Sequence, residues 1–247
     1  MVLRDLTPAL HEFVLCTALL EEFDAALCNA VLGRQDAARL IGLIAGQALF
    51  LQECAGRPGW YRYHALFQDF LQNRLRVESP ERILALHCAA AEHLVQRGET
   101  EGALLHGERG TPECFERTLG HCCRQWLTRG DYGPIIRWLG ALPEDKLAAN
   151  SDLFMPFVSA LIFSRRFNQA RYYLDVVQAA TTPAEGRLAD DSAPVFLEVM
   201  LQLFQHDTDF RLRDDHAVLL GSCRHHDIRA FSLAMLAYHH MLHADFV

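Results

Sequence analysis

The sequence has no apolar run that is long enough to cross a membrane as a helix. Its longest stretches without a charged residue are 40–52 and 230–244, and both are shorter than the about 18 apolar residues that a spanning helix needs. Arg4 and Asp5 stand near the N-terminus, where a secretory signal would have an apolar segment. These absences argue against a membrane-spanning or secreted class, and they predict a cytoplasmic protein with no membrane partner.

An excess of positive charge is also missing. The net charge of the 247 residues is −8, and the first 77 residues hold seven arginines against eight aspartates and glutamates. Proteins that hold nucleic acid mainly through phosphate contacts need a basic surface. We therefore expect no direct contact between this chain and nucleic acid.

The eight cysteines do not form the pattern of a disulfide scaffold. They fall at irregular spacings, and two of them, Cys122 and Cys123, are adjacent. A disulfide framework is typical of small secreted domains, and this chain is larger than those. The pattern favours reduced thiols.

The sequence lacks the motifs of the common catalytic sites. It has neither Gly-x-x-x-x-Gly-Lys-Ser/Thr for phosphates nor Gly-x-Ser-x-Gly for a nucleophilic serine. The nearest match, Gly221-Ser222-Cys223, lies in a helical pattern. We expect no catalytic residue, no enzyme activity and no cofactor in this chain.

Thirteen histidines make a metal site worth testing. His239 and His243 have the spacing of zinc ligands on one helix face, but His240 occupies the place of the general-base glutamate of a metalloprotease. The runs 121–123 and 223–226 also contain histidine and cysteine, yet neighbours on a helix point apart. The sequence therefore predicts no metal ligands.

Residues 1–77 have the element order of a winged helix. Pro8 suits the first turn of one helix, a second helix is expected from near Asp24 to Gly33, and a third from about 36 to 46. Leu49-Phe50-Leu51 and Trp60-Tyr61-Arg62-Tyr63 then read as two strands around a loop rich in glycine and proline. Three helices followed by a β-hairpin are typical of that fold.

Winged helices often bind DNA, and the third helix would then be the reading helix. It offers Arg34 and Arg39. Its middle, however, is filled with apolar residues, and groove reading needs polar side chains aimed at base edges. Those apolar residues are Leu40, Ile41, Leu43 and Ile44. The pattern favours packing over DNA reading.

Residues 78–247 are expected to be helical throughout. Three segments align about Gly98, Gly130 and Arg165, at steps of 32 and 35 residues. Tetratricopeptide repeats have a period near 34. We therefore predict a mainly α fold with two domains: a winged helix with one β-hairpin at 1–77, and a tetratricopeptide-like α-α superhelix at 78–247.

The period is harder to follow beyond Asp175. Helices are expected at about 193–205, 214–223 and 227–243, with loops at 181–186 and 206–209. No polar capping repeat closes the array, so we expect the superhelix to be truncated at its C-terminus.

Aromatic residues of the superhelix follow helical spacing, and most are expected to wedge between helices. A curved array also leaves a concave face that could take an effector or a partner helix. The sequence leaves the effector-binding residues unknown. The aromatic residues are Trp126, Trp138, Phe154, Phe157, Phe163, Phe167, Tyr172 and Tyr173.

Three segments resemble the MalT-like regulators, the large ATP-dependent members of the LuxR family and of the signalling ATPase (STAND) class. Residues 59–67, GWYRYHALF, and residues 13–20, FVLCTALL, resemble the winged helix of that family. Residues 127–131 and 138–143 resemble the start of its sensor superhelix. The chain thus looks like a central fragment of such a regulator.

The resemblance implies an inducer-controlled transcription activator. ATP and an effector would release inhibition, the protein would self-associate, and the winged helix would pack on the nucleotide-binding domain. A histidine of this domain can touch the nucleotide phosphates, and His64 is the candidate here. ATP or ADP would belong to the parent protein. His64 could instead cap the next helix or hydrogen-bond within the cluster of Trp60, Tyr61 and Tyr63.

Two functional classes remain open. The first is the sensor and inhibitory segment of a MalT-like activator, whose partners are its own nucleotide-binding domain, other copies of the parent, and an inducer or regulatory protein. The second is a stand-alone tetratricopeptide-like scaffold that binds a protein partner. A small apolar pocket would favour the first, and an open groove with exposed aromatics the second.

Overall fold

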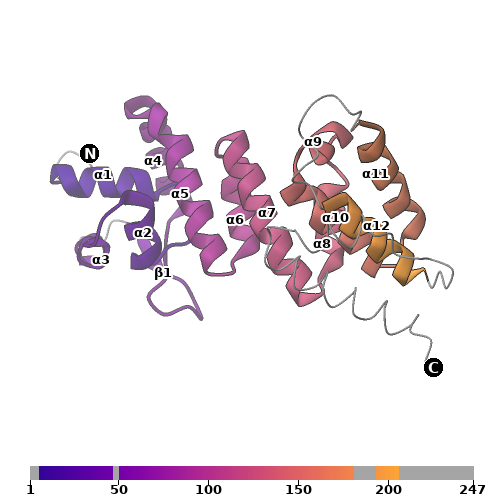
Figure 1. The fold of residues 1–247 in the computed structure, drawn as a ribbon. Helices are drawn as coiled ribbons and strands as arrows, with labels where there is room; N and C mark the ends of the chain where they lie inside the picture. Colours follow the sequence, from indigo (N-terminus) through magenta and orange to yellow (C-terminus); the bar gives the residue numbers. More distant parts are fainter. Residues whose placement is uncertain (1–5, 47–49, 181–192, 206–247) are drawn as a thin grey trace, which may run out of the picture. The chain divides into compact units, whose positions relative to one another are not determined.

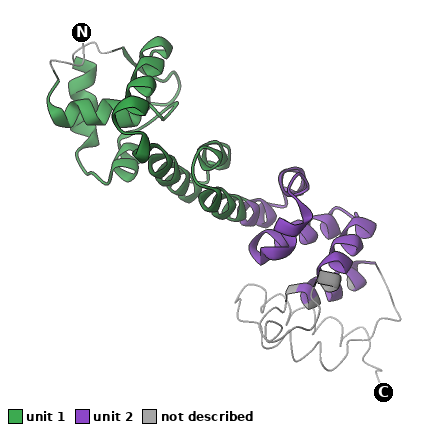
Figure 2. Cartoon of the chain, turned by 90° about the horizontal axis from the view of Figure 1, so that it is seen from above, with its two compact units in different colours: residues 1–122 green, residues 123–247 purple. Residues whose placement is uncertain are grey.

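The computed structural model describes residues 6–46, 50–180 and 193–205. These residues fall into two compact units, 1–122 and 123–247, and the boundary lies within one long helix (Figure 2). Each unit is described here by itself. No helix among the described residues is both long and apolar enough to cross a membrane.

Unit 1 begins with three short helices and a two-stranded hairpin, and continues with further helices (Figure 1). Its elements are α1 (Pro8–Thr17), α2 (Ala25–Leu32), α3 (Ala37–Gly46), β1 (Leu51–Glu53), β2 (Tyr61–Tyr63), α4 (Ala65–Glu78), the 3-10 turn η1 (Pro80–Arg82), α5 (Ile83–Gln96), α6 (Thr100–Glu108) and the first part of α7 (Pro112–Arg129).

Local signals set the ends of α2 as the sequence predicts. The Asp24 side chain accepts a hydrogen bond from the backbone N–H of Leu27 at 2.8 Å, so it caps the first turn. Gly33 ends the helix in the left-handed conformation with φ 63°, which glycine adopts at little cost. At α1, Pro8 is the first helical residue as expected, but the Thr7 side chain makes no capping hydrogen bond.

The hairpin corrects one prediction. The first strand is Leu51–Glu53 rather than Leu49-Phe50-Leu51, because Phe50 has φ 50° and turns the chain just before the strand begins. The strands are antiparallel, with Leu51 opposite Tyr63. Phe23 forms a further antiparallel bridge to Tyr61, through two backbone hydrogen bonds of 2.8 Å. The hairpin is therefore tied to the segment that precedes α2.

A single core joins the winged-helix elements to the first helices that follow. α1 packs on α4, α2 packs on α5, and α5 pairs with α6. This packing places the first helical hairpin in the same compact unit as the winged helix. The domain boundary that we place after Val77 stays a prediction. Fully buried core side chains of this unit include Phe13, Phe23, Leu20, Leu27, Leu40, Ile44, Leu71, Leu75 and Leu119.

Unit 2 contains helices whose described core is almost entirely apolar. After the end of α7 come α8 (Tyr132–Leu139), α9 (Glu144–Ala149), α10 (Ser151–Phe163), α11 (Phe167–Ala180) and α12 (Ala193–Phe204). α10 packs on α8, α9, α11 and α12. The aromatic wedges expected at Phe154, Phe157 and Trp126 are buried, whereas Tyr172 is exposed.

The three aligned turns have one geometry. Gly98, Gly130 and Arg165 have φ values of 75°, 77° and 58°. In each turn, the N–H of this residue donates a hydrogen bond to the carbonyl three residues before it. The N–H of the next residue donates to the carbonyl five residues before itself, and all these distances are 2.8 to 3.1 Å. This is the Schellman arrangement. The predicted equivalence of the three turns is confirmed, and the tetratricopeptide class of the hairpins stays a prediction.

Several predictions fall on residues that the structure does not describe. The loops at 181–186 and 206–209, the helices at 214–223 and 227–243, and the histidines from His225 to His243 lie outside the described residues. The helix expected at 193–205 is α12. None of the seven described cysteines forms a disulfide.

Candidate docking site

The third helix of the winged helix has little to offer a DNA groove. Leu40, Ile41 and Ile44 are buried in the core, as predicted, whereas Leu43 is 42% exposed and does not pack there. Both arginines share one carboxylate: Arg34 Nε and an Arg39 guanidinium nitrogen each lie 2.9 Å from an oxygen of Asp36. These two hydrogen bonds lower the pKa of Asp36 to about 2. The arginines are therefore engaged within the turn that starts the helix.

A group of exposed aromatic and aliphatic side chains lies just before β1 and along α4. We call Phe50, Leu66 and Phe70 the aromatic face; their exposed fractions are 53%, 76% and 51%. The ring of Phe67, which is 9% exposed, connects them, because its centroid is 5.4 Å from that of Phe50 and 6.4 Å from that of Phe70. Large apolar side chains gathered on a surface mark an interaction site more often than single ones do.

Phe50 is held in this place at a conformational cost. Its φ of 50° is in the left-handed region, which residues with a bulky side chain rarely adopt. The backbone is fixed there because the Phe50 carbonyl accepts a hydrogen bond from the His64 N–H at 2.7 Å. Strained residues that the surrounding structure holds in place are common at functional sites.

α4 presents the aromatic face because its opposite side is anchored. Leu71 and Leu75 are buried, and the side-chain amides of Gln68 and Gln72 donate hydrogen bonds of 2.9 to 3.0 Å to backbone carbonyls of Ala18 and Leu20. The anchored side fixes the rotation of the helix. Leu66 and Phe70, four residues apart, must then face outward.

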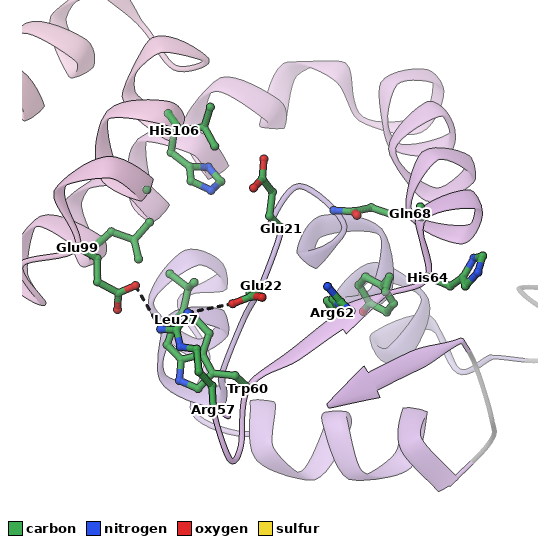
Figure 3. A pocket seen from close by; sticks show the side chains of 15 residues that line it. Glu21, Glu22, Leu27, Arg57, Trp60, Arg62, His64, Gln68, Glu99 and His106 are labelled. Atoms are coloured by element: carbon green, nitrogen blue, oxygen red, sulfur yellow. Dashed lines mark hydrogen bonds and ion pairs between the residues drawn. The ribbon is translucent and has the colours of Figure 1, made fainter. Parts of the chain in front are cut away.

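His64 lies at the rim of the aromatic face. It immediately precedes α4, and its carbonyl accepts the N–H groups of Phe67 and Gln68 at 2.9 Å. The side chain is exposed and makes no capping hydrogen bond. Its ring is 6.5 Å from that of Phe50, and it points away from Trp60 (Figure 3). His64 therefore occupies the N-cap position of α4, as one alternative expected, but its side chain does not form the cap and does not point towards Trp60.

Trp60 has a different role, in a clamp between the hairpin loop and the turn that connects α5 to α6. The guanidinium of Arg57 lies 3.6 Å from the centroid of its ring, and that of Arg97 lies 4.8 Å away. Glu99 is paired with both arginines, at 3.4 Å to Arg57 and 3.0 Å to Arg97. Cation-π contacts and shared ion pairs thus hold the loop on the first helical hairpin.

A cavity of about 600 Å³ opens beside this clamp (Figure 3). Its walls include Glu21, Arg62, Gln68 and His106, besides the clamp residues. The volume is in the range of small-molecule sites. Trp60 also lines the cavity, but two guanidiniums already lie over its ring. We assign no effector to it.

His87 and His106 form a buried pair in the core of unit 1. They are 5% and 4% exposed, and their Nδ1 atoms are 2.8 Å apart. One Nδ1 must donate to this hydrogen bond and the other must accept it, so at least one of the two rings is neutral. Burial lowers the pKa of each to about 4, and the nearby Arg109 acts in the same direction. The pair joins α5 to α6.

Sequence reasoning missed the aromatic face, although a signal for it was available. α4 has one apolar set at 67, 71 and 75, which is buried, and a second at 66, 70 and 77, which is exposed. A helix with one buried side needs only one of these sets. The second, exposed set indicates that this side of α4 contacts a further surface. By contrast, the clamp at Trp60 and the His87–His106 pair depend on contacts that no local pattern reveals.

This arrangement of three short helices, a hairpin and an anchored fourth helix defines a winged helix joined to helical hairpins. Residues 1–83 match the family model described as the MalT winged helix domain. Residues 1–83 are therefore a winged helix domain of the MalT type, and the chain is similar to MalT regulators over this part and beyond it.

Curated relatives agree with this assignment. The chain is 28% identical over 155 residues to the HTH-type transcriptional regulator MalT of Klebsiella pneumoniae subsp. pneumoniae. The aligned residues are 62% of this chain and 17% of that protein. It is 32% identical over 94 residues to MalT of Vibrio cholerae (38% and 10%). It is 31% identical over 105 residues to the serine/threonine-protein kinase PknK of Mycobacterium tuberculosis (42% and 10%). The chain thus spans 10% to 17% of the length of these relatives.

Proposed function

We propose that this chain is the regulatory segment of an ATP-dependent transcription activator, in which the winged helix docks on the nucleotide-binding domain and restrains it. The aromatic face carries the proposal. Phe50, Leu66 and Phe70 are exposed together, and one of them is held in a strained conformation. An apolar face of this kind suits a protein domain, whereas Arg34, just before α3, and Arg39, in its first turn, are engaged with Asp36.

The helical hairpins would supply sensing and self-association. The turns at Gly98, Gly130 and Arg165 share one geometry, which supports a repeated unit of the kind that forms extended binding surfaces. An inducer or a regulatory protein would bind there. The parent would hold ATP or ADP and bind DNA through other domains, in the cytoplasm, and this segment would have no catalytic role of its own.

The docking proposal is tested in the full-length parent by placing a charge on the aromatic face. Phe70→Glu should weaken docking, because a carboxylate in an apolar interface loses its hydration. We expect higher reporter transcription without inducer. Leu84→Glu is the matched control: Leu84 is 48% exposed, on α5 and outside the face. Equal basal transcription in Phe70→Glu and wild type would reject the proposal.

We further propose that His64, at the edge of the docked face, contacts the nucleotide phosphates. Its ring makes no capping bond and is exposed, so it is available for such a contact. In the full-length parent, His64→Ala should speed ADP release about tenfold, the loss expected for one hydrogen bond to a charged group. A stopped-flow measurement with labelled ADP would decide; an unchanged rate would remove His64 from the nucleotide site and leave the docking proposal intact.

A further inference from the structure

Two cysteines of unit 1 come together although they are far apart in sequence. Cys88 is on α5 and Cys114 is in the first turn of α7. Both sulfurs border the same small space next to Gly110. A Cβ atom at Gly110 would lie 2.8 Å from the Cys88 Sγ and 3.4 Å from the Cys114 Sγ. A side chain at this position would therefore displace the Cys88 sulfur.

The two thiols also interact electrostatically and differ in their access to solvent. The pKa of Cys114 is raised to about 11, first by burial and then by its interaction with the Cys88 thiol. Cys114 is 2% exposed, whereas Cys88 is half-buried. An oxidant would therefore meet Cys88 first, and Cys114 would be the buried thiol beside it.

We propose that Cys88 and Cys114 are a site of reversible oxidation that forms a disulfide between α5 and α7. The oxidant is a peroxide. The Cys88 thiolate attacks one peroxide oxygen, the O–O bond breaks, and hydroxide leaves, which gives a sulfenic acid. The Cys114 sulfur then attacks the Cys88 sulfur; an S–S bond forms, the S–O bond breaks, and the Cys114 thiol proton leaves with the hydroxyl as water. Two thiols and one hydrogen peroxide thus yield one disulfide and two waters.

The consequence for unit 1 is a covalent tie around α6. The closed loop runs from Cys88 to Cys114 and contains His106, the partner of His87. Oxidation would hold the α5–α6 hairpin against the first turn of α7. A cross-link of this kind reduces the conformational entropy of the unfolded chain and thereby stabilises the folded state. The disulfide is independent of the docking function proposed above, because neither cysteine belongs to the aromatic face.

Peptide mapping of the whole 247-residue chain tests the proposal directly. Trypsin separates the relevant thiols, since Cys88 falls in peptide 83–97, Cys114 in 110–117, and the neighbouring Cys122 and Cys123 in 118–124. After treatment with hydrogen peroxide, we expect the chain to lose about 2 Da, the mass of two hydrogens, and the peptides 83–97 and 110–117 to appear linked. Dithiothreitol should restore both the mass and the separate peptides.

Variants separate this site from general oxidation. Cys88→Ser replaces the accessible thiol and should abolish the linked peptide. Cys122→Ser, on the same helix as Cys114, should leave it unchanged. Oxidised wild type should melt about 5 °C or more above the reduced form, a difference that Cys88→Ser should lack. Linkage of any other pair, oxygen addition to Cys88 without a disulfide, or no reaction would each overturn the proposal.

Discussion

Unit 1 and unit 2 are both helical, but their cores are built from different side chains. Four buried polar side chains of the described residues belong to unit 1, namely Thr17, His87, His106 and Thr118, and one, Ser159, belongs to unit 2. In unit 1, His87 pairs with His106, and Thr17 pairs with the backbone and with Tyr63. For example, the Thr17 hydroxyl is 2.8 Å from the Tyr63 hydroxyl and 2.7 Å from the Phe13 carbonyl.

The described core of unit 2 depends instead on apolar packing. Phe157 is 2% exposed, and its ring meets that of Tyr173 edge to face at 4.8 Å. Leu139 and Leu174 are fully buried. Apolar packing tolerates changes of pH but responds strongly to lost volume, whereas buried titratable groups make stability depend on pH. Unit 1 should therefore lose stability mainly when the pH changes, and unit 2 mainly when a buried side chain is shortened.

The largest effect is expected from a cavity in unit 2. Phe157→Ala should lower the free energy of unfolding of this unit by about 3 to 5 kcal/mol. Tyr172→Ala, at a side chain that is 51% exposed, should cost less than about 1 kcal/mol. Urea unfolding followed by fluorescence measures both changes. In a Trp60→Phe background the remaining tryptophans, Trp126 and Trp138, report unit 2. Equal losses for the two variants would contradict this account of the core.

The next effect is a pH dependence of unit 1. The pKa values of His87 and His106 are lowered to about 4 in the folded state, so the unfolded chain binds protons first as the pH falls. Stability is full above pH 6.5 and falls progressively towards pH 4. By pH 5 the loss is about 2 kcal/mol for each histidine. Urea unfolding at pH 7 and pH 5 measures it, with Trp60 as the reporter in a Trp126→Phe/Trp138→Phe background.

A double variant provides the control for this pH dependence. His87→Leu/His106→Leu removes both partners of the buried hydrogen bond and keeps a similar volume, which can be nearly neutral at pH 7. Its stability should change much less between pH 7 and pH 5 than that of the wild type. If both proteins lose the same free energy of unfolding between pH 7 and pH 5, groups other than these two histidines cause the pH dependence. The contrast between the units would then be wrong on this point.

The smallest effect is expected at two turns of unit 2 that have the same geometry but different residues. Gly130 and Arg165 have φ values of 77° and 58°. Arg165→Gly should stabilise unit 2 by up to about 1 kcal/mol, because it relieves the left-handed strain, and Gly130→Ala should destabilise it by about the same amount. Thermal melting checks both. A stabilising Gly130→Ala would show that the left-handed geometry carries no cost for a side chain here.

Local chemistry explains why much of the fold could be predicted. The ends of α2 follow from Asp24 as a cap and Gly33 as a left-handed residue, and the three aligned turns follow from the spacing of Gly98, Gly130 and Arg165. Each of these features depends on residues within a few positions of one another. Such short-range hydrogen bonds form in the same way wherever the helix is placed.

The candidate site was less predictable. His64 was placed correctly before α4, but its side chain neither caps the helix nor joins the cluster around Trp60. The first strand began two residues later than predicted, because Phe50 adopts a positive φ. The hydrogen bond from His64 to the Phe50 carbonyl stabilises that turn, and it joins residues that are distant in sequence.

By itself, the sequence determined the helical class, the order of the winged-helix elements, the positions of the turns and the resemblance to MalT-like regulators. These properties depend on periodicity and on local hydrogen bonds. The tertiary structure alone decided which side of α4 is exposed, that His87 meets His106 and that Cys88 lies beside Cys114. Each of these contacts joins separate helices, so it follows from how the helices pack and rotate against one another rather than from any single stretch of residues.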